Sequence, residues 1–510
     1  MTVKITSDLL QMMVKIYFLS RIVSYVLKLY FCPVFQKTDM NINNKDTIRN
    51  YFDSIAPVRQ KWKKKRRYYN KSLENYFSFL IPAGCRVLEI GCGTGELLDS
   101  VKPAYGAGID FSEGMIQIAR QSFPNLHFKV DDIEELQLDE KFDYIMMSDL
   151  TMTLWDVQLA FKNLQQVCHE RTKIVISNYN FLWEPLLKLA ERLRLKLKQP
   201  NQNWLSTQDI KNLLHLTGFE TVKSDRKILI PFYIPFLSFI FNRFFANLPL
   251  LNRLALINFI VARPVVRSIE QDYSVSIIIP ARNEKGNIEN AVKRLPVFGS
   301  SQEIIFVEGH SSDQTHEEML RIQATYPEKN IKVQMQTGKG KGNAVREGFE
   351  TATGDILFIL DADLTTPPED MPKFYEALKT NKGEFINGCR LVYPMEKQAM
   401  RLLNLIANKS FGMLFTYLLG QPLKDTLCGT KVLFRKDYGI IKENRGYFGD
   451  FDPFGDFDLL FGAAKLNLKL TEIIVRYKDR EYGSTQISRF KHGWLLIKMC
   501  IFAARKIKFI

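Results

Sequence analysis

The chain has 510 residues, more than one ordinary domain holds, so we expect two or three domains. Hydrophobic residues make up 46% and charged residues 25%, which is typical of a globular protein and argues against long disordered regions. A formal net charge of +15 favours partners that carry phosphate: nucleic acid, anionic lipid or a phosphorylated substrate. The 37 Phe residues suit a membrane surface better than nucleic acid.

Cysteine and histidine are arranged in no metal-binding pattern. The seven Cys include no Cys-x-x-Cys pair, which indicates a reducing, cytoplasmic environment. The six His have no metal-ligand spacing, so oxygen ligands would hold any metal, and Mg or Mn is expected.

Residues 1–45 are predicted to form an amphipathic N-terminal segment. The stretch Leu9–Phe35 is apolar, but Lys15, Arg21 and Lys28 interrupt it. A secretory signal lacks such charges, and a spanning helix needs about 20 mostly uncharged residues. The segment either packs on the protein or lies on a membrane.

Residues 46–266 are predicted to form a first α/β domain. The basic run Lys61–Arg67 suggests a helix that covers a cofactor, or a phosphate site. The buried strand Arg86–Ile90, which carries Glu89, leads into a loop with Gly91, Gly93 and Gly95. These glycines let the backbone turn sharply and approach a ligand.

Carboxylates follow the next strands of this domain. Asp110 ends the second strand about 20 residues after the glycine loop, where it can accept the hydroxyls of a ribose. Asp131, Asp132 and Ile133 follow the third strand, Leu126–Val130, and a fourth strand spans Phe142–Met147.

This series resembles that of the class I S-adenosylmethionine-dependent methyltransferases, with a Rossmann-like fold. The resemblance implies that Glu89 and the glycine loop meet the methionine portion of the cofactor, Asp110 the ribose, and Asp132 with Ile133 the adenine. A dinucleotide-binding dehydrogenase shares the glycine loop, but nothing here resembles its hydride-transfer residues. The remaining alternative is a non-catalytic binding or regulatory module.

The methyl acceptor is not identified by any motif. No Asn-Pro-Pro-Tyr-type sequence follows the fourth strand, so methylation of nucleic acid is not supported. Asp149, Trp155 and Asp156 lie where acceptors usually bind.

Residues 228–253 form an apolar insertion in this domain, with three Pro, many Phe and charge only at Arg243 and Arg253. Pro231 and Pro235 argue against one continuous spanning helix. The insertion either packs on the fold or dips into the interface of a bilayer.

Residues 273–490 are predicted to form a second α/β domain. Strand-end motifs follow in order: Pro280, Ala281 and Glu284 after one strand, Glu308 after the next, then the glycine-rich basic loop 337–343. A further apolar strand ends in Asp361 and Asp363. Two such close carboxylates repel each other unless a divalent cation bridges them to a diphosphate.

These motifs resemble those of the family 2 glycosyltransferases of the GT-A fold, most closely the polyprenyl-phosphate sugar synthases. The resemblance implies that Pro280, Ala281 and Glu284 cradle the nucleoside of a nucleotide diphosphate sugar, with Glu308 near the base. It implies that Asp361 and Asp363 hold the metal and the diphosphate. Arg390 would face the phosphates, and Arg480 would belong to a late loop that closes over the donor. The family's usual Lys after Ser484 is replaced here by Thr485-Gln486.

The sugar acceptor is left with two alternatives. A polyprenyl phosphate or other lipid-linked phosphate is already anionic and only needs positioning, whereas a glycan hydroxyl needs a general base. Asp456 and Asp458 lie near where family members with hydroxyl acceptors carry that base. Direct displacement predicts inversion at the anomeric carbon.

Residues 491–510 are predicted to form an amphipathic, membrane-associated helix. Trp494, Ile497 and Ile501 are among its apolar residues, and Lys498, Arg505, Lys506 and Lys508 could reach lipid phosphates. We therefore expect a bifunctional enzyme of the cytoplasm, peripheral at the inner face of the membrane, that does not act on nucleic acid.

Overall fold

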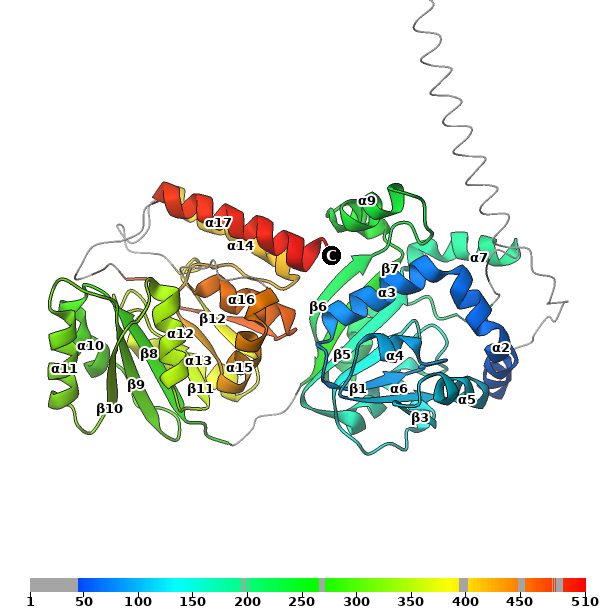
Figure 1. Ribbon diagram of the computed structural model, residues 1–510, viewed down its shortest axis with the longest axis horizontal. Coiled ribbons are helices and arrows are strands. Elements are labelled where there is room, and N and C mark those ends of the chain that lie inside the picture. Colours follow the sequence, from blue (N-terminus) through cyan, green and yellow to red (C-terminus); the bar gives the residue numbers. More distant parts are fainter. Residues whose placement is uncertain are drawn as a thin grey trace, which may run out of the picture. The chain divides into compact units, whose positions relative to one another are not determined.

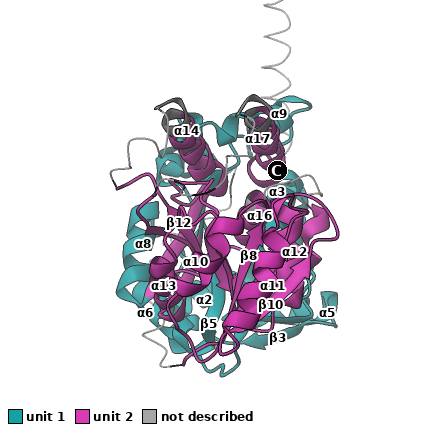
Figure 2. Ribbon diagram, turned by 90° about the vertical axis from the view of Figure 1, so that its left-hand side faces the viewer, with its two compact units in different colours: residues 1–218, 226–260 teal, residues 219–225, 261–510 magenta. Residues whose placement is uncertain are grey.

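A computed structural model describes residues 45–193, 196, 199–200, 202–265, 271–393, 402–447, 455–478, 480, 482 and 489–510. The predicted N-terminal segment, apart from Lys45, and the Thr485-Gln486 pair lie outside the described residues. The chain divides into two compact units (Figure 2). Unit 1 comprises residues 1–218 and 226–260, and unit 2 comprises residues 219–225 and 261–510.

The first sheet has seven strands in the order β3-β2-β1-β4-β5-β7-β6. They are β1 (Arg86–Ile90), β2 (Tyr105–Asp110), β3 (His127–Val130), β4 (Phe142–Ser148), β5 (Cys168–Tyr179), β6 (Phe219–Lys227) and β7 (Ile257–Pro264). The strands from β3 to β5 pair in parallel. Because the chain winds outward from β1 in both directions, the carboxyl ends of β1 and β4 meet at a topological switch point, where such sheets bind ligands.

The described residues of unit 1 form these α-helices beside the sheet (Figure 1): α2 (Lys45–Lys65), α3 (Arg67–Leu80), α4 (Glu96–Ser100), α5 (Glu113–Ser122), α6 (Val157–Asn163), α7 (Glu184–Arg192), α8 (Thr207–Leu216) and α9 (Leu237–Arg243). Several begin at a residue that caps free backbone amides. Ser112 Oγ accepts from Met115 N at the start of α5, and Ser206 with Asp209 forms a capping box at α8.

The second sheet also has seven strands, in the order β10-β9-β8-β11-β13-β12-β14. They are β8 (Val275–Ala281), β9 (Gln302–Glu308), β10 (Asn330–Met335), β11 (Ile356–Ile359), β12 (Phe385–Cys389), β13 (Lys431–Phe434) and β14 (Leu470–Ile474). Strands β10, β9, β8 and β11 are parallel, and β13 is antiparallel to both of its neighbours.

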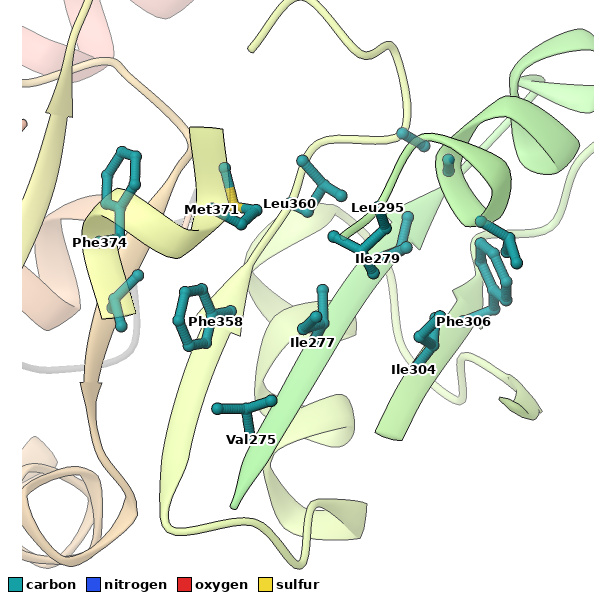
Figure 3. Close-up of a cluster of buried hydrophobic side chains, with 14 of the residues drawn as sticks. Val275, Ile277, Ile279, Leu295, Ile304, Phe306, Phe358, Leu360, Met371 and Phe374 are labelled. Atoms are coloured by element: carbon teal, nitrogen blue, oxygen red, sulfur yellow. The ribbon is translucent and has the colours of Figure 1, made fainter. Parts of the chain in front are cut away.

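The helices of unit 2 are α10 (Ile288–Lys293), α11 (Thr315–Thr325), α12 (Lys341–Thr351), α13 (Met371–Lys379), α14 (Leu402–Leu419), α15 (Arg435–Glu443), α16 (Asp456–Lys465) and α17 (Arg489–Ala503). Figure 3 shows part of the core on one face of the sheet, where Ile277, Phe306 and Phe358 pack with Phe374 of α13. Strands covered on both faces need an almost continuous apolar sequence, which explains why β8 reads Val-Ser-Ile-Ile-Ile.

The predicted fold class, two doubly wound α/β domains, is confirmed. Within the described parts of the chain, no helix is long and apolar enough to cross a bilayer.

Candidate functional sites

A cavity of about 1030 Å³ opens in unit 1 at the carboxyl ends of β1, β2 and β4. Gly91 and Gly93 line it, with φ angles of 71° and 53° that favour glycine. Gly95, at φ 87°, precedes α4, and a Cβ there would lie 2.8 Å from the Phe128 ring. The glycine loop therefore takes the tight course that the sequence predicted.

Two predicted carboxylates stand beside this loop. Asp110 accepts hydrogen bonds from Gly93 N (2.8 Å) and Ser112 N (2.9 Å), which fixes it at the end of β2. Glu89 is buried, and its Oε2 has no hydrogen-bond partner in the structure. Burial raises the pKa of Glu89 to about 8 and also raises the pKa of Asp110. A buried oxygen without a partner indicates that a polar ligand belongs there.

The adenine end of the predicted cofactor site is formed after β3. Asp132 Oδ1 accepts from Glu134 N at 2.9 Å, and Lys45 Nζ of α2 lies 2.6 Å from Asp132 Oδ2. Ile133 is buried and lines the cavity. Lys45 therefore holds the start of α2 over the predicted site.

The basic run Lys61–Arg67 lies where α2 gives way to α3. Lys63, Arg66 and Arg67 line the cavity, and Lys63 Nζ donates to Thr94 Oγ1 at 3.0 Å. This arrangement places positive charge at the cavity wall, and the role of the run as a helical cover over a cofactor remains a prediction.

The sequence did not predict that two tyrosines pair on the cavity wall. Tyr69 Oη donates to Asp149 Oδ2 at 2.8 Å, and Ser177 Oγ donates to Asp149 Oδ1 at 3.0 Å. The Tyr69 ring stacks on Tyr179, with centroids 6.3 Å apart. Burial raises the pKa of Tyr69 and that of Asp149. Asp149 also has φ 54°, and such strain gathers at functional sites.

The two other acceptor-side candidates differ in their placement. Trp155 lines the cavity. Asp156 Oδ1 instead accepts from Leu159 N at 2.9 Å and caps α6. Asp156 thus has a structural role that its position in the sequence did not reveal.

The second site gathers at the carboxyl ends of β8, β9 and β11 in unit 2. Asn283, His310 and Leu364 all have positive φ angles just after these strands. Three strained turns at one edge of a sheet indicate a functional edge.

Each of the predicted metal carboxylates is engaged by a cation. Lys341 Nζ lies 2.6 Å from Asp361 Oδ1, and Arg480 Nη2 donates to Asp363 Oδ2 at 2.6 Å. Burial alone would raise the pKa of Asp361, but the charge of Lys341 beside it holds that pKa below its ordinary value. Lys341, the first residue of α12, is a site residue that the sequence motifs did not identify.

Arg480 joins two of the predicted motifs. Besides Asp363, it donates through Nη1 to Glu284 Oε1 at 2.9 Å. Burial raises the pKa of Glu284 to about 7 even though Arg480 opposes the shift. Pro280 and Ala281 lie at the end of β8, next to Glu284.

Glu308 holds the turn after β9. Its carboxylate accepts from His310 N at 3.0 Å and from Ser311 N at 2.6 Å. The predicted contact with a nucleobase remains a prediction.

Arg390 is paired with a buried carboxylate. Its Nε and Nη2 donate to the two oxygens of Asp425 at 2.8 and 2.9 Å, a bidentate contact. Gly429, in the same loop as Asp425, is approached so closely by Asp361 Oδ2 that a Cβ would lie 1.9 Å from that oxygen. Asp425 and Gly429 therefore shape the surroundings of the metal carboxylates.

The predicted general bases lie on α16. Asp458 is buried, and its Oδ2 accepts from Arg445 Nε at 2.8 Å. The side chain of Asp456 lies outside the described residues.

The C-terminal helix α17 has apolar side chains on its buried side and on its exposed side. Leu496 and Met499 of α17 are buried, whereas Trp494, Ile497 and Ile501 are exposed. Lys498 and Arg505 are exposed as well. The prediction that Lys508 reaches lipid phosphates is wrong, because that side chain is buried and its ammonium lies 3.0 Å from Asp225.

Comparison with protein families assigns both domains. Residues 62–224 match the model described as a methyltransferase domain, and residues 276–439 match glycosyl transferase family 2. Both ranges lie inside the domains predicted from the sequence.

The chain is similar to curated sugar transferases. A dolichol-phosphate mannosyltransferase from Pyrococcus furiosus is 39% identical over 120 residues, 23% of this chain and 33% of the relative. An undecaprenyl-phosphate 4-deoxy-4-formamido-L-arabinose transferase from Pectobacterium carotovorum is 32% identical over 228 residues, 44% of this chain and 65% of the relative. The chain thus spans between one third and two thirds of the length of these relatives.

Among solved structures, a SAM-dependent methyltransferase from Thermotoga maritima, described as a possible histamine N-methyltransferase, is 20% identical. It aligns with 42% of this chain and 99% of its own, with a TM-score of 0.34. On the two family matches, the chain carries a methyltransferase domain followed by a family 2 glycosyltransferase domain.

Proposed function

We propose that residues 273–490 transfer a sugar, with inversion, from a nucleotide diphosphate sugar to a polyprenyl phosphate or another lipid-linked acceptor. Residues 46–266 are proposed to transfer a methyl group from S-adenosylmethionine to an acceptor still to be identified. The observation that carries the first activity is the carboxylate pair Asp361 and Asp363 at a strand end, surrounded by cationic side chains.

The residues at this strand end fit a divalent cation of the Mg or Mn type. Among the described residues no three carboxylate, imidazole or thiolate groups gather as a complete cage. Mg²⁺ does not need one, because it commonly binds one or two carboxylates and takes its other ligands from substrate phosphates and water. Asp361 and Asp363 would hold the ion, and it would neutralise charge on the departing diphosphate.

Cationic side chains of this chain would bind the same diphosphate. Lys341 and Arg480 now neutralise Asp361 and Asp363, and a metal ion would release both cations toward phosphate oxygens. Arg390 is oriented by Asp425, so its guanidinium keeps a fixed position. Glu284 would orient the nucleoside through the same Arg480 contact.

An anionic lipid phosphate is the favoured sugar acceptor. The curated relatives are named for undecaprenyl phosphate and dolichol phosphate. Such an acceptor needs no general base, and the candidate base Asp458 is already ion-paired with Arg445. Transfer to a glycan hydroxyl, with Asp456 or Asp458 as the base, is the alternative outcome.

The cavity of unit 1 fits S-adenosylmethionine. Its glycine loop has the backbone that a close ligand requires, and the unpartnered Glu89 Oε2 would meet the methionine portion of the cofactor. The Asp110 carboxylate keeps free lone pairs beside its two amide bonds and can accept ribose hydroxyls. When bound, the cofactor supplies an activated methyl group.

A membrane is the proposed location, peripheral and at the cytoplasmic face. The outward side chains Trp494, Ile497 and Ile501 of α17 would enter the interface, with Lys498 and Arg505 beside lipid phosphates.

The sugar-transfer proposal is tested with Asp363→Asn in the full chain. We expect this variant to lose metal-dependent turnover of a nucleotide diphosphate sugar. The control is Asp370→Asn, which removes an exposed ion pair with Lys373 in the same unit and should keep full activity. Full activity of Asp363→Asn would show that the metal assignment is wrong.

The methyltransferase proposal is tested by calorimetry with S-adenosylmethionine. Asp110→Ala should weaken binding strongly, whereas Asp99→Ala, on the exposed side of α4, should not. Absence of binding by the wild type, or equal binding by Asp110→Ala, would contradict the proposed cofactor site and favour a non-catalytic module.

A further inference from the structure

Unit 1 carries a large exposed apolar surface that its fold does not explain. Of the large hydrophobic side chains exposed in the described parts of the chain, fourteen lie in residues 181–193 and 232–254. Phe236 is 84% exposed and Leu250 is 76% exposed. We call these two segments the apolar patch, and contiguous surfaces of this kind mark interaction sites.

Helix α7 contributes one amphipathic face to the apolar patch. It has no buried residue, yet Leu186, Leu189 and Leu193 are each about half exposed and recur at helical spacing. The charged Lys188 and Glu191 fall on the opposite side of the same helix. This apolar face is not buried by any described residue of unit 1, so it needs a partner beyond those residues.

The insertion, residues 228–253, forms the second part of the apolar patch. Its polar side chains bond to its own backbone. Ser238 Oγ accepts from Ile234 N and donates to Phe232 O, both at 2.7 Å, and Asn242 Oδ1 accepts from two backbone amides. Phe236, the residue just before α9, has φ 60°. A strained backbone that exposes a phenyl ring to solvent indicates that the ring has a function, such as contact with a partner.

Hydrogen bonds join the two segments into one surface. Trp183 Nε1, just before α7, donates to Leu254 O at 2.9 Å, and Asn180 Nδ2 donates to Arg253 O and Ala255 O, each at 2.9 Å. Figure 1 shows α7 and α9 at the same end of unit 1. The insertion therefore packs on the fold and still presents its phenylalanines outward.

The charge of residues 232–254 in the apolar patch favours an anionic lipid surface. Residues 226–269 contain no Asp or Glu, while Arg243 and Arg253 flank the exposed phenylalanines. Arg253 is exposed, and the Arg243 guanidinium lies 5.5 Å from the centroid of the Phe239 ring. Aromatic and leucine side chains with Arg at the rim are typical of elements that lie in the bilayer interface.

The apolar patch borders the methyltransferase cavity. The Tyr233 ring lies 5.8 Å from that of Tyr68 on α3, and Tyr68 Oη accepts from Asn242. The residues on either side of Tyr68, Arg67 and Tyr69, line the cavity. A lipid headgroup at this face would therefore lie beside the cavity.

We propose that the apolar patch docks the methyltransferase domain on an anionic membrane, independently of α17, and brings its cavity to the lipid surface. The acceptor of the methyl group is then carried by a membrane lipid, a consequence that rests on the proposed methyl transfer.

The test uses the full chain with vesicles of phosphatidylglycerol and phosphatidylcholine. Leu250→Asp should weaken co-sedimentation with these vesicles about tenfold, because it removes a leucine from the interface and adds a negative charge. Leu216→Asp is the matched control: the same residue type in unit 1, 68% exposed on α8, and expected to leave binding unchanged. Hydrogen exchange of residues 232–254 should slow when vesicles are added, which separates the apolar patch from α17.

Three results would overturn the proposal. The first is equal vesicle binding by the wild type and both variants. The second is exchange in residues 232–254 that vesicles do not change. The third is a dimer in lipid-free solution that Leu250→Asp dissociates, which would make the apolar patch an interface between copies. Calorimetry with S-adenosylmethionine on Leu250→Asp, expected to match the wild type, shows that the domain is folded and keeps failure of docking distinct from failure of the methyltransferase assignment.

Discussion

Gly429 offers the sharpest perturbation of the sugar-transfer site. An alanine Cβ at this position would lie 1.9 Å from Asp361 Oδ2 and 2.5 Å from Lys341 Nζ. Real Cβ atoms keep at least about 3.0 Å, so the carboxylate must move by roughly 1 Å. Because Asp361 is a proposed metal ligand, Gly429→Ala should displace the metal and the diphosphate together.

A displacement of about 1 Å in a reacting group can cost about 100-fold in rate, which corresponds to about 2.7 kcal/mol. We therefore expect Gly429→Ala to lower Mn²⁺-dependent binding of nucleoside diphosphates, measured by calorimetry with UDP and GDP, and to lower donor turnover by about that factor.

Gly439→Ala is the matched control, since a Cβ there meets nothing within 4 Å. It lies within α15, so the alanine should leave binding intact and stabilise the helix by up to about 1 kcal/mol. Wild-type nucleotide binding by Gly429→Ala would refute the placement of Asp361 against the loop of Gly429.

Three further predictions concern single side chains. Because burial raises the pKa of Glu89 from 4.5 to about 8, the folded state holds an extra proton between these pH values. Stability without cofactor should then fall by about 1.4 kcal/mol per unit as pH rises from 4.5 toward 8, and Glu89→Gln should remove that slope in thermal unfolding. Gly95→Ala should destabilise unit 1 more than Gly84→Ala in urea unfolding, since both glycines have positive φ but only a Cβ at Gly95 meets Phe128. Arg390→Lys should cost about 3 kcal/mol in urea unfolding, because a lysine cannot keep the bidentate contact with buried Asp425. The first prediction is contradicted if Glu89→Gln keeps the pH slope of the wild type. The second is contradicted if Gly95→Ala is as stable as Gly84→Ala, and the third if Arg390→Lys is as stable as the wild type.

The sequence was most informative where strands are buried. The predicted Arg86–Ile90 matches β1, and the predicted strands that lead to Asp110, Glu308 and Asp361 are all present, because a parallel strand covered on both faces must be apolar and its polar loop follows abruptly. The same pattern, an apolar strand followed by a polar loop, predicted the positions of the glycine loop and of the carboxylates at the strand ends.

The sequence was least informative where distant segments meet. Tyr69 and Asp149 are 80 residues apart, and Arg390 and Asp425 are 35 apart, yet each pair is joined by hydrogen bonds. Pairing of this kind depends on tertiary packing and leaves no local periodicity. The apolar insertion showed the same limit, since composition could not reveal that it both packs on the fold and exposes Phe236.

Product analysis tests the central claim most directly. The full chain is incubated with Mg²⁺ or Mn²⁺, a panel of nucleotide diphosphate sugars and undecaprenyl phosphate in vesicles, and the lipids are examined by mass spectrometry. We predict a polyprenyl phosphate that has gained one sugar, formed only with metal and absent with Asp363→Asn. Transfer to a glycan hydroxyl without any lipid, or a lipid product that persists in Asp363→Asn, would contradict the account.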